Sequence, residues 1–150
     1  MSEPRQTFDI ASHHLWGRAN IGRKVYISDM ARLRGDTRHV HIGELAQLHD
    51  FVVLMASAPL MVGRAAQLNY GAVVQAYAPI QLCAGVTLGN MAQVLSGQRT
   101  LAGFETGPVV VGTGAIIGPG AVILPGSTVP AGACLQANEV YGAPDTNGRV

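Results

Sequence analysis

The chain has 150 residues and a formal net charge of +1, and 48% of its residues are hydrophobic while only 5% are aromatic. This length predicts one domain with a core of small aliphatic side chains, and the near-neutral charge gives no argument for a nucleic-acid partner. Two cysteines are too few for a disulfide framework or a zinc-thiolate site. The N-terminal residues lack the apolar run of a signal peptide, and the longest apolar stretch, 51–63, contains Pro59 and is too short to span a bilayer. The sequence therefore predicts a cytoplasmic protein that binds neither nucleic acid nor a membrane.

Residues 1–14 are predicted as an N-terminal arm, and a six-residue repeat begins at Leu15. An aliphatic residue then recurs at every sixth position within groups of three, and a small residue follows most of them four places later. After Leu15 the aliphatic residues are Ile21, Ile27, Leu33, Ile42, Leu48, Leu54, Val62, Leu68, Val74, Leu82, Leu88, Val94, Val111, Ile117, Ile123, Val129 and Leu135. Residues 143–150 are predicted as a C-terminal tail.

A period of six matches neither the 3.6 residues of a helical turn nor the alternation of one long strand. It suits a chain that bends every six residues, so that three short strands make one triangular coil and the coils stack about 4.8 Å apart. Glycines such as Gly112 and Gly118 directly follow the aliphatic residue, and we expect them to free the backbone at the bends. The sequence therefore predicts an all-β fold, a parallel β-helix of about six triangular coils over residues 15–142.

Extra residues separate each group of three repeats from the next, so we expect all insertions at one corner of the column. The insertions are residues 37–41, 57–61, 78–81 and 95–110. The last and longest of them is predicted as a loop that leaves the column.

A small-molecule pocket is predicted beside a column of outward residues. The residue after the third aliphatic of each coil is Arg34, Met55, Gln75 or Leu95, and these four should stack. We expect Asn69, Tyr70 and Tyr77 beside them. No charged residue occurs from 65 to 98, and an uncharged surface of that length is usually covered by another chain or a ligand. Two interpretations stay open, an apolar pocket with a few polar groups for an organic ligand and a subunit seam packed by Met55, Tyr70 and Tyr77.

The hexad pattern resembles the left-handed β-helix of the hexapeptide-repeat superfamily over nearly the whole chain. Residues 107–133 are similar to the C-terminal coils of its CoA-dependent acyltransferases, and YGAP at 141–144 resembles the G-x-P turn that closes their acyl-CoA site. The resemblance implies a homotrimer with active sites in the clefts between subunits. It also implies acetyl-CoA or another acyl-CoA as co-substrate, with no tightly bound cofactor. The cofactor-binding positions implied are Ala115, Gly118, Gly120 and Pro144.

The catalytic histidine of that branch projects from the longest insertion. Gln98 or Arg99 stands about where it should be, and neither side chain is a base near neutral pH. The usual proton acceptor for acyl transfer is therefore missing from this position.

The N-terminal half also resembles the γ-class carbonic anhydrases. LRGD at residues 33–36 resembles their R-G-D segment, whose Arg and Asp pair across the trimer interface, and IGELAQLHD at 42–50 resembles their I-G-x-x-x-N-I-Q-D segment. Met55, Tyr70 and Gln75 occupy the places of the three zinc-binding histidines, and these side chains are poor ligands for Zn²⁺. We therefore predict no metal there. The pair His39 and His41 lacks a third ligand, so no metal is predicted at that pair either.

His49 replaces the glutamine of the Q-D pair that borders the active cleft in the carbonic anhydrase branch. A histidine can act as a lone acid or base there, or it can fill an interface with a hydrogen bond to a neighbouring subunit. Asp50 follows directly, and the alternation of a strand predicts that the two side chains point to opposite faces.

Three functions stay open. The first is an acyltransferase-like protein that acts on a small molecule at inter-subunit clefts, with His49 or mere proximity of the reactants replacing the usual catalytic histidine. The second is a metal-free relative of the γ-carbonic anhydrases whose interface pocket binds or transforms another small molecule by cyclisation, elimination or thioester hydrolysis. The third is a non-catalytic trimeric scaffold. The catalytic candidates are His49 and Tyr70, and the substrate-binding candidates are Arg34, Asp50, Met55, Asn69, Gln75 and Tyr77.

Overall fold

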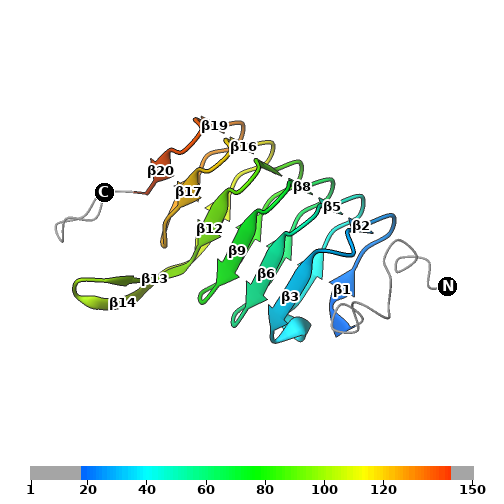
Figure 1. Cartoon of the computed structure of the whole chain (residues 1–150), viewed down its shortest axis with the longest axis horizontal. Helices are drawn as coiled ribbons and strands as arrows, with labels where there is room; N and C mark the ends of the chain where they lie inside the picture. Colours follow the sequence, from blue (N-terminus) through cyan, green and yellow to red (C-terminus); the bar gives the residue numbers. More distant parts are fainter. Residues whose placement is uncertain (1–17, 143–150) are drawn as a thin grey trace.

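The computed structural model describes residues 18–142, and these residues form a column of stacked β-coils (Figure 1). The predicted arm, the predicted tail and Pro144 lie outside the described residues. Within 18–142 the secondary structure consists of 20 short strands and one 3₁₀ turn, η3 (Thr37–His39). No helix in this part of the chain is long and apolar enough to cross a membrane.

Three parallel six-stranded sheets form the sides of the column, and consecutive strands belong to different sheets. Sheet A contains β1 (Asn20–Ile21), β4 (Val40–Ile42), β7 (Leu60–Val62), β10 (Ile80–Leu82), β15 (Val109–Val111) and β18 (Thr128–Val129). Sheet B contains β2 (Tyr26–Ile27), β5 (Gln47–Leu48), β8 (Gln67–Leu68), β11 (Thr87–Leu88), β16 (Ile116–Ile117) and β19 (Cys134–Leu135). Sheet C contains β3 (Arg32–Gly35), β6 (Val53–Ala56), β9 (Val73–Ala76), β12 (Gln93–Leu95), β17 (Val122–Ile123) and β20 (Val140–Tyr141). Each coil takes one strand from each sheet, which confirms the prediction of about six coils.

The repeated aliphatic residues fill the interior. Leu48, Leu68 and Leu88 are fully buried and stand at the same register position in neighbouring strands of sheet B. Small residues such as Ala46 and Ala66 are also fully buried, because the column is narrow where the chain bends. Each coil thus buries its apolar face against the next, and burial of apolar surface contributes about 25 cal/mol per Å² to folding.

The glycines that follow the aliphatic residues are needed for a different reason from the predicted one. Gly112 and Gly118 do not have positive φ angles, so they do not relieve the bends. A Cβ on Gly118 would lie 2.6 Å from the carbonyl oxygen of Leu135 in the next coil. The left-handed backbone occurs two residues later, at Gly114 and Gly120 (φ 72° and 73°). The close approach of the next coil therefore excludes a side chain at Gly112 and Gly118.

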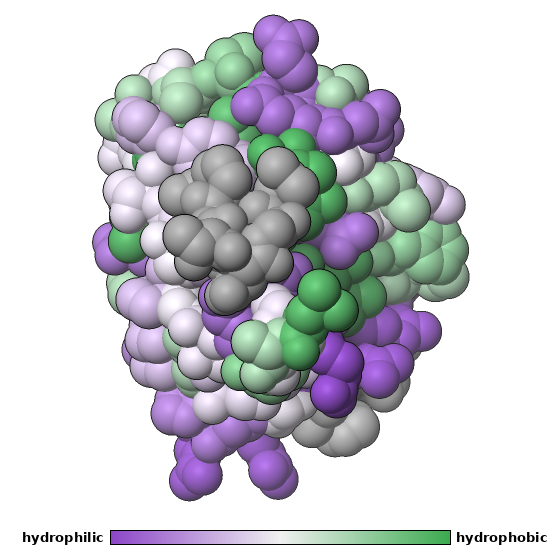
Figure 2. Space-filling view, turned by 90° about the vertical axis from the view of Figure 1, so that its left-hand side faces the viewer, coloured by the Kyte–Doolittle hydropathy of each residue, from purple (hydrophilic) through white to green (hydrophobic). Residues whose placement is uncertain are grey.

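The longest insertion is a β-hairpin and not the predicted loop. Strands β13 (Gly97–Thr100) and β14 (Gly103–Thr106) pair in antiparallel fashion and project from the column (Figure 1). At the tip, the Thr100 hydroxyl donates to the carbonyl of Gly103 at 3.1 Å, and Gly103 takes a φ of 129° that favours glycine. Figure 2 views the molecule from this side and shows hydrophobic and hydrophilic residues next to one another.

Candidate functional site

The polar residues predicted for catalysis lie on the turns that join sheet B to sheet C. We call these stacked turns, residues 49–52, 69–72, 89–92 and 118–121, the site corner. Backbone hydrogen bonds link each turn to the next, from Gly71 N to Asp50 O at 2.9 Å, from Met91 N to Tyr70 O at 2.8 Å and from Gly120 N to Asn90 O at 2.9 Å. Equivalent residues of successive turns are therefore held one above another.

A shallow groove of about 410 Å³ lies along the site corner. Its lining residues are Tyr26, His49, Asp50, Asn69, Tyr70 and Asn90. The sequence predicted four of these six as site residues, and the structure brings those four together. Asn90 was missed although it has the same place in its turn as Tyr70, and the repeat register could have found it. Tyr26 was missed because it lies on the outer side of β2, before the turn.

The His49 ring is half-buried and lies against the ring of Tyr26, with a centroid distance of 5.7 Å and an interplanar angle of 47°. Strand β5 ends at Leu48, so His49 and Asp50 both lie in the turn. The alternation of a strand does not apply there, and both side chains line the groove instead of pointing to opposite faces. Among the described residues no hydrogen bond joins the two side chains, so Asp50 does not orient the imidazole as in a triad.

Asp50 is held from the preceding coil. The buried hydroxyl of Ser28 donates to Asp50 Oδ1, and the same hydroxyl accepts a hydrogen bond from the backbone N–H of Met30 at 3.0 Å. Because Ser28 uses both its donor and one of its acceptor positions, its hydroxyl proton points at the carboxylate. The Asp50 carboxylate therefore has a fixed place on the groove wall.

Aromatic and apolar side chains border the groove on the outside. Tyr70 is 50% exposed and meets Phe51 edge-on, with 5.3 Å between ring centroids. Phe51 and Met91 adopt left-handed backbone angles (φ 65° and 64°), a conformation that costs on the order of 1–3 kcal/mol for a residue other than glycine. The Met91 side chain occupies the space that a Cβ on Gly71 would need. Exposed apolar groups and backbone strain thus occur together at the site corner.

The sequence matches no protein-family model and no curated protein. Its structure is similar to a point mutant of AntD, an N-acyltransferase from Bacillus cereus, in complex with dTDP and coenzyme A (TM-score 0.76, 18% identity, 86% of this chain and 78% of that chain). It is also similar to AntD in complex with dTDP and 3-hydroxybutyryl-CoA (TM-score 0.69, 17% identity, 87% and 81%). A third similar structure is the hexapeptide-repeat-containing acetyltransferase VCA0836 from Vibrio cholerae (TM-score 0.66, 17% identity, 89% and 79%). The chain therefore shares its fold with these proteins, a column of stacked β-coils with three parallel sheets as its sides.

The other predicted substrate residues of the column do not line the groove. The strand register stacks Arg34, Met55, Gln75 and Leu95 as predicted. They lie toward the ends of the sheet C strands, however, whereas Asn69 and Tyr70 lie in the turns before those strands. Gln75 follows Tyr70 by five residues, which corresponds to up to about 16 Å of extended backbone. Asn69 and Tyr70 line the groove and the four stacked residues do not, so a pocket that combines the two sets stays a prediction.

Tyr77 belongs to the base of the hairpin. Its ring meets Phe104 of β14 edge-on at 5.1 Å, and a Cβ on Gly97 would overlap it. The buried hydroxyl of Ser96 fixes this base, since it accepts hydrogen bonds from the N–H groups of Tyr77 and Ala78, both at 2.9 Å, and donates to the Ala78 carbonyl at 2.7 Å.

No group of three or more His, Cys, Asp or Glu residues within 18–142 could hold a metal ion. In the RGD segment, Asp36 accepts a hydrogen bond from the backbone N–H of Arg38 at 3.1 Å and pairs with its guanidinium at 3.3 Å. The side-chain hydrogen bond from Arg38, followed by the backbone one, lowers the pKa of Asp36. Asp36 therefore has a partner within its own chain, while Arg34 is exposed.

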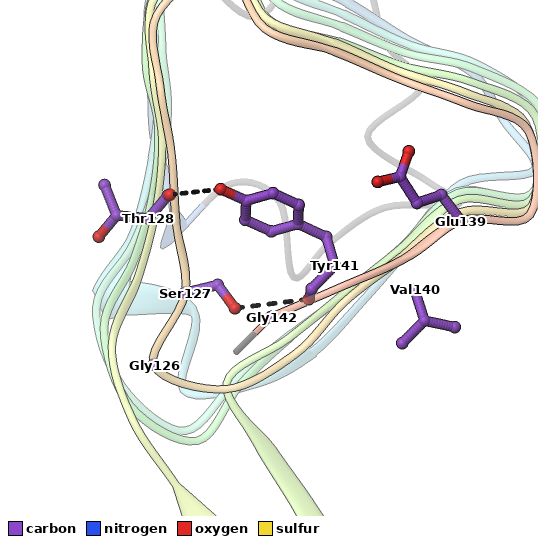
Figure 3. Close-up of a pocket in the computed structure, with 7 residues that line it drawn as sticks. All are labelled: Gly126, Ser127, Thr128, Glu139, Val140, Tyr141 and Gly142. Atoms are coloured by element: carbon purple, nitrogen blue, oxygen red, sulfur yellow. Dashed lines mark hydrogen bonds between the residues drawn. The ribbon is translucent and has the colours of Figure 1, made fainter. Parts of the chain in front are cut away.

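A second hollow, of about 520 Å³, lies at the last coil (Figure 3). It is lined by Gly126, Ser127, Thr128, Glu139, Val140, Tyr141 and Gly142. The Tyr141 hydroxyl donates to the Thr128 carbonyl at 3.1 Å, which ties β20 to the start of β18. The sequence analysis did not predict this hollow as a site, although Tyr141 and Gly142 begin the segment likened to the closing turn.

The structure places three of the four predicted cofactor residues. Ala115 is fully buried, and its backbone N–H and carbonyl are both engaged in hydrogen bonds, so it has no group to offer a ligand. Gly118 is buried under the next coil. Gly118 and Gly120 both lie on the site corner, but Gly120 is only partly buried and its N–H donates to the carbonyl of Asn90 at 2.9 Å, so Gly120 is the predicted cofactor residue that adjoins the groove.

Proposed function

We propose that the protein is an acyltransferase that uses acyl-CoA to acylate a small molecule in the groove at the site corner. The observation that carries this proposal is the half-buried His49 imidazole, which lines a groove together with carboxylate, amide and phenol groups. Several polar groups that converge in one hollow are typical of a small-molecule site. The fold is one on which similar structures hold coenzyme A or 3-hydroxybutyryl-CoA.

His49 serves as the proton acceptor in this proposal, in place of the histidine missing from the hairpin. Its ring nitrogens have no hydrogen bond to another described residue, and the stack against Tyr26 restricts the ring plane. The acceptor nucleophile gives its proton to His49 and attacks the thioester carbonyl, the C–S bond breaks, and CoA leaves as the thiol. Attack on the carbonyl forms a tetrahedral intermediate with an oxyanion before the C–S bond breaks. The Tyr70 hydroxyl and the amides of Asn69 and Asn90 can donate hydrogen bonds to this oxyanion.

Acyl-CoA is a co-substrate here and not a tightly held cofactor. We assign acyl-CoA to the turn at 118–121, which contains Gly120 and continues the site corner toward the C-terminus. Pro144, the other cofactor residue of this assignment, lies outside the described residues. Gln98 and Arg99 lie on β13 of the hairpin, and neither replaces the base, because an amide and a guanidinium do not accept protons near neutral pH.

A homotrimer completes this account. Large hydrophobic side chains on the stacked turns between sheets B and C, those of Met30, Phe51, Tyr70 and Met91, are 41–56% exposed, and a neighbouring column would cover them. Each groove then becomes a cleft between two subunits, as the resemblance implies. A cytoplasmic location fits a reaction that consumes acyl-CoA.

Binding of CoA tests the proposal against the metal-free and scaffold alternatives. A ligand that binds only the folded state raises the melting temperature, by about 5 °C or more for a chain of this size at a hundredfold excess over Kd. We expect acetyl-CoA to stabilise the wild type and desulfo-CoA, which cannot react, to do the same. An unchanged melting temperature at millimolar acetyl-CoA would exclude the acyltransferase proposal.

A further inference from the structure

We propose that the groove binds its acceptor as a cation, a protonated primary amine held by the Asp50 carboxylate between the faces of Tyr26 and Tyr70. This inference rests on the proposed acyl transfer for the reaction, but the cation site itself does not depend on CoA. It adds the chemical class of the acceptor, which the proposed function leaves open.

The charges around the groove select a cation. Asp50 is the one carboxylate among the six lining residues, and none of the six is Lys or Arg. The turns that carry Asn69 and Asn90 belong to the stretch from 65 to 98, which has no charged residue. The Arg32 guanidinium does not line the groove, because it donates to the carbonyl oxygens of Asp29 and Ala31 in the first coil, both at 3.2 Å. A phosphate or carboxylate in the groove would therefore meet a like charge, with no cation among the described lining residues to offset it.

The Asp50 carboxylate is arranged to receive a ligand. The Ser28 hydroxyl donates to its Oδ1, and Oδ2 has no hydrogen bond to a described residue. Ser28 is only 3% exposed and lies in a different coil, so it fixes the carboxylate without occupying the groove. One oxygen is thus used for positioning while the other can accept a charge-assisted hydrogen bond from an ammonium group.

Aromatic rings flank the carboxylate. Tyr26 and Tyr70 line the groove and are 44% and 50% exposed, and Phe51 supports Tyr70 edge-on at 5.3 Å. An ammonium group over the face of such a ring is stabilised by about 0.5–1 kcal/mol at an exposed site and by more when water is excluded. The Asn69 and Asn90 amides can bind a polar substituent of the amine. A carboxylate with two aromatic walls and neutral polar ends fits an organic cation.

The reaction balances with an amine as acceptor. The bound ammonium gives one proton to His49, and the neutral nitrogen attacks the thioester carbonyl. A C–N bond forms, the C–S bond breaks, and the second proton of the nitrogen moves to the departing sulfur. The products are an amide and CoA thiol, and the proton on His49 is released to water.

Binding of simple probes tests the cation site without CoA. The probes are n-butylamine, tetramethylammonium, n-butanol and butyrate, followed through the ring proton NMR signals of Tyr26 and Tyr70. We expect the two cations to bind and the alcohol and the carboxylate to leave the signals unchanged. D50N should weaken the binding of n-butylamine about tenfold, the loss of one charge-assisted hydrogen bond, and the binding of tetramethylammonium, which has no N–H to donate, by less. Y70L should weaken it as well, whereas D36N, which removes a carboxylate outside the groove, should not.

The outcomes separate the cation site from the proposed function. Binding of butyrate or butanol as tight as that of n-butylamine, or full cation affinity in folded D50N, would overturn the cation site. Acetyl-CoA turnover with n-butanol in preference to n-butylamine would overturn it too while leaving acyl transfer intact. Cation binding that depends on Asp50, without any CoA binding, would support the cation site and exclude acyl transfer.

Discussion

The Ser28 hydroxyl in the first coil donates a hydrogen bond to the Asp50 carboxylate in the second. Ser28 and His49 have equivalent places in consecutive turns, so the stacking of the coils itself brings the donor to the residue after His49. A contact between residues 22 positions apart thus becomes a local contact in the column. It fixes the one carboxylate among the six described residues that line the groove.

Removal of the Ser28 hydroxyl should loosen Asp50. We expect S28A to lower the free energy of unfolding by about 1 kcal/mol, the net contribution of one such hydrogen bond, and to weaken binding of n-butylamine several-fold. Urea denaturation and NMR titration measure the two effects. S57A is the matched control, because the exposed Ser57 hydroxyl contacts only the Met55 sulfur. Equal effects of S28A and S57A on amine binding would show that Ser28 does not position Asp50.

Replacement of one interior leucine should test the packed column. Leu68 is fully buried between Leu48 and Leu88 in the middle of sheet B. We expect L68A to cost about 2–5 kcal/mol of unfolding free energy, the usual range for a buried Leu→Ala change. Q67A, the adjacent outward residue, should cost less than about 0.5 kcal/mol. Similar values for the two variants would contradict the assignment of inward and outward positions.

The base of the hairpin depends on Ser96. In S96A the part-buried N–H groups of Tyr77 and Ala78 lose their acceptor, and we expect the loss of each hydrogen bond to cost about 1 kcal/mol. We expect amide exchange to become faster at residues 77, 78 and 97–106 and to stay unchanged in the first coils. T100A, which affects only the hairpin tip, should leave residues 77 and 78 protected. Unchanged exchange in S96A would exclude this anchoring role.

The lowered pKa of Asp36 predicts how the stability of the fold depends on pH. The hydrogen bonds from Arg38 lower its pKa below the ordinary value for aspartate, so the folded state binds a proton less readily than the unfolded state. This contribution to stability is present above the unfolded pKa and is lost as the pH falls through the lower, folded pKa. A carboxyl titration by NMR should find the pKa of Asp36 below the ordinary value for aspartate, and R38A should raise that pKa. An unchanged Asp36 titration in R38A would contradict the assigned cause.

The repeat made most of the fold predictable. Leu48, Leu68 and Leu88 each had to point inward if the chain bends every six residues, and the register of Arg34, Met55 and Gln75 followed from the same rule. The hairpin at 97–106 was not predictable in this way because its strands pair with each other and not with a neighbouring coil. Periodicity contains no information about such a local pairing.

The site was predictable only in part. The alternation of side chains along a strand predicted that His49 and Asp50 point to opposite faces. These residues lie in a turn, however, and both line the groove. Tyr26 lies before the bend and reaches the groove because the corner brings the outer side of sheet B next to the turn. Side-chain directions in a turn depend on its backbone angles, and the hexad pattern does not specify them.

Release of CoA thiol from acetyl-CoA, with n-butylamine as acceptor, is the most direct test of acyl transfer in the groove. Wild type and H41Q, which changes an exposed imidazole on sheet A, should release thiol at the same saturable rate. H49Q should lower kcat by about 10²-fold or more, the typical contribution of a general base, while its melting temperature stays near that of the wild type. Thiol release by folded H49Q at the wild-type rate, or no amine-dependent release by the wild type, would contradict the account.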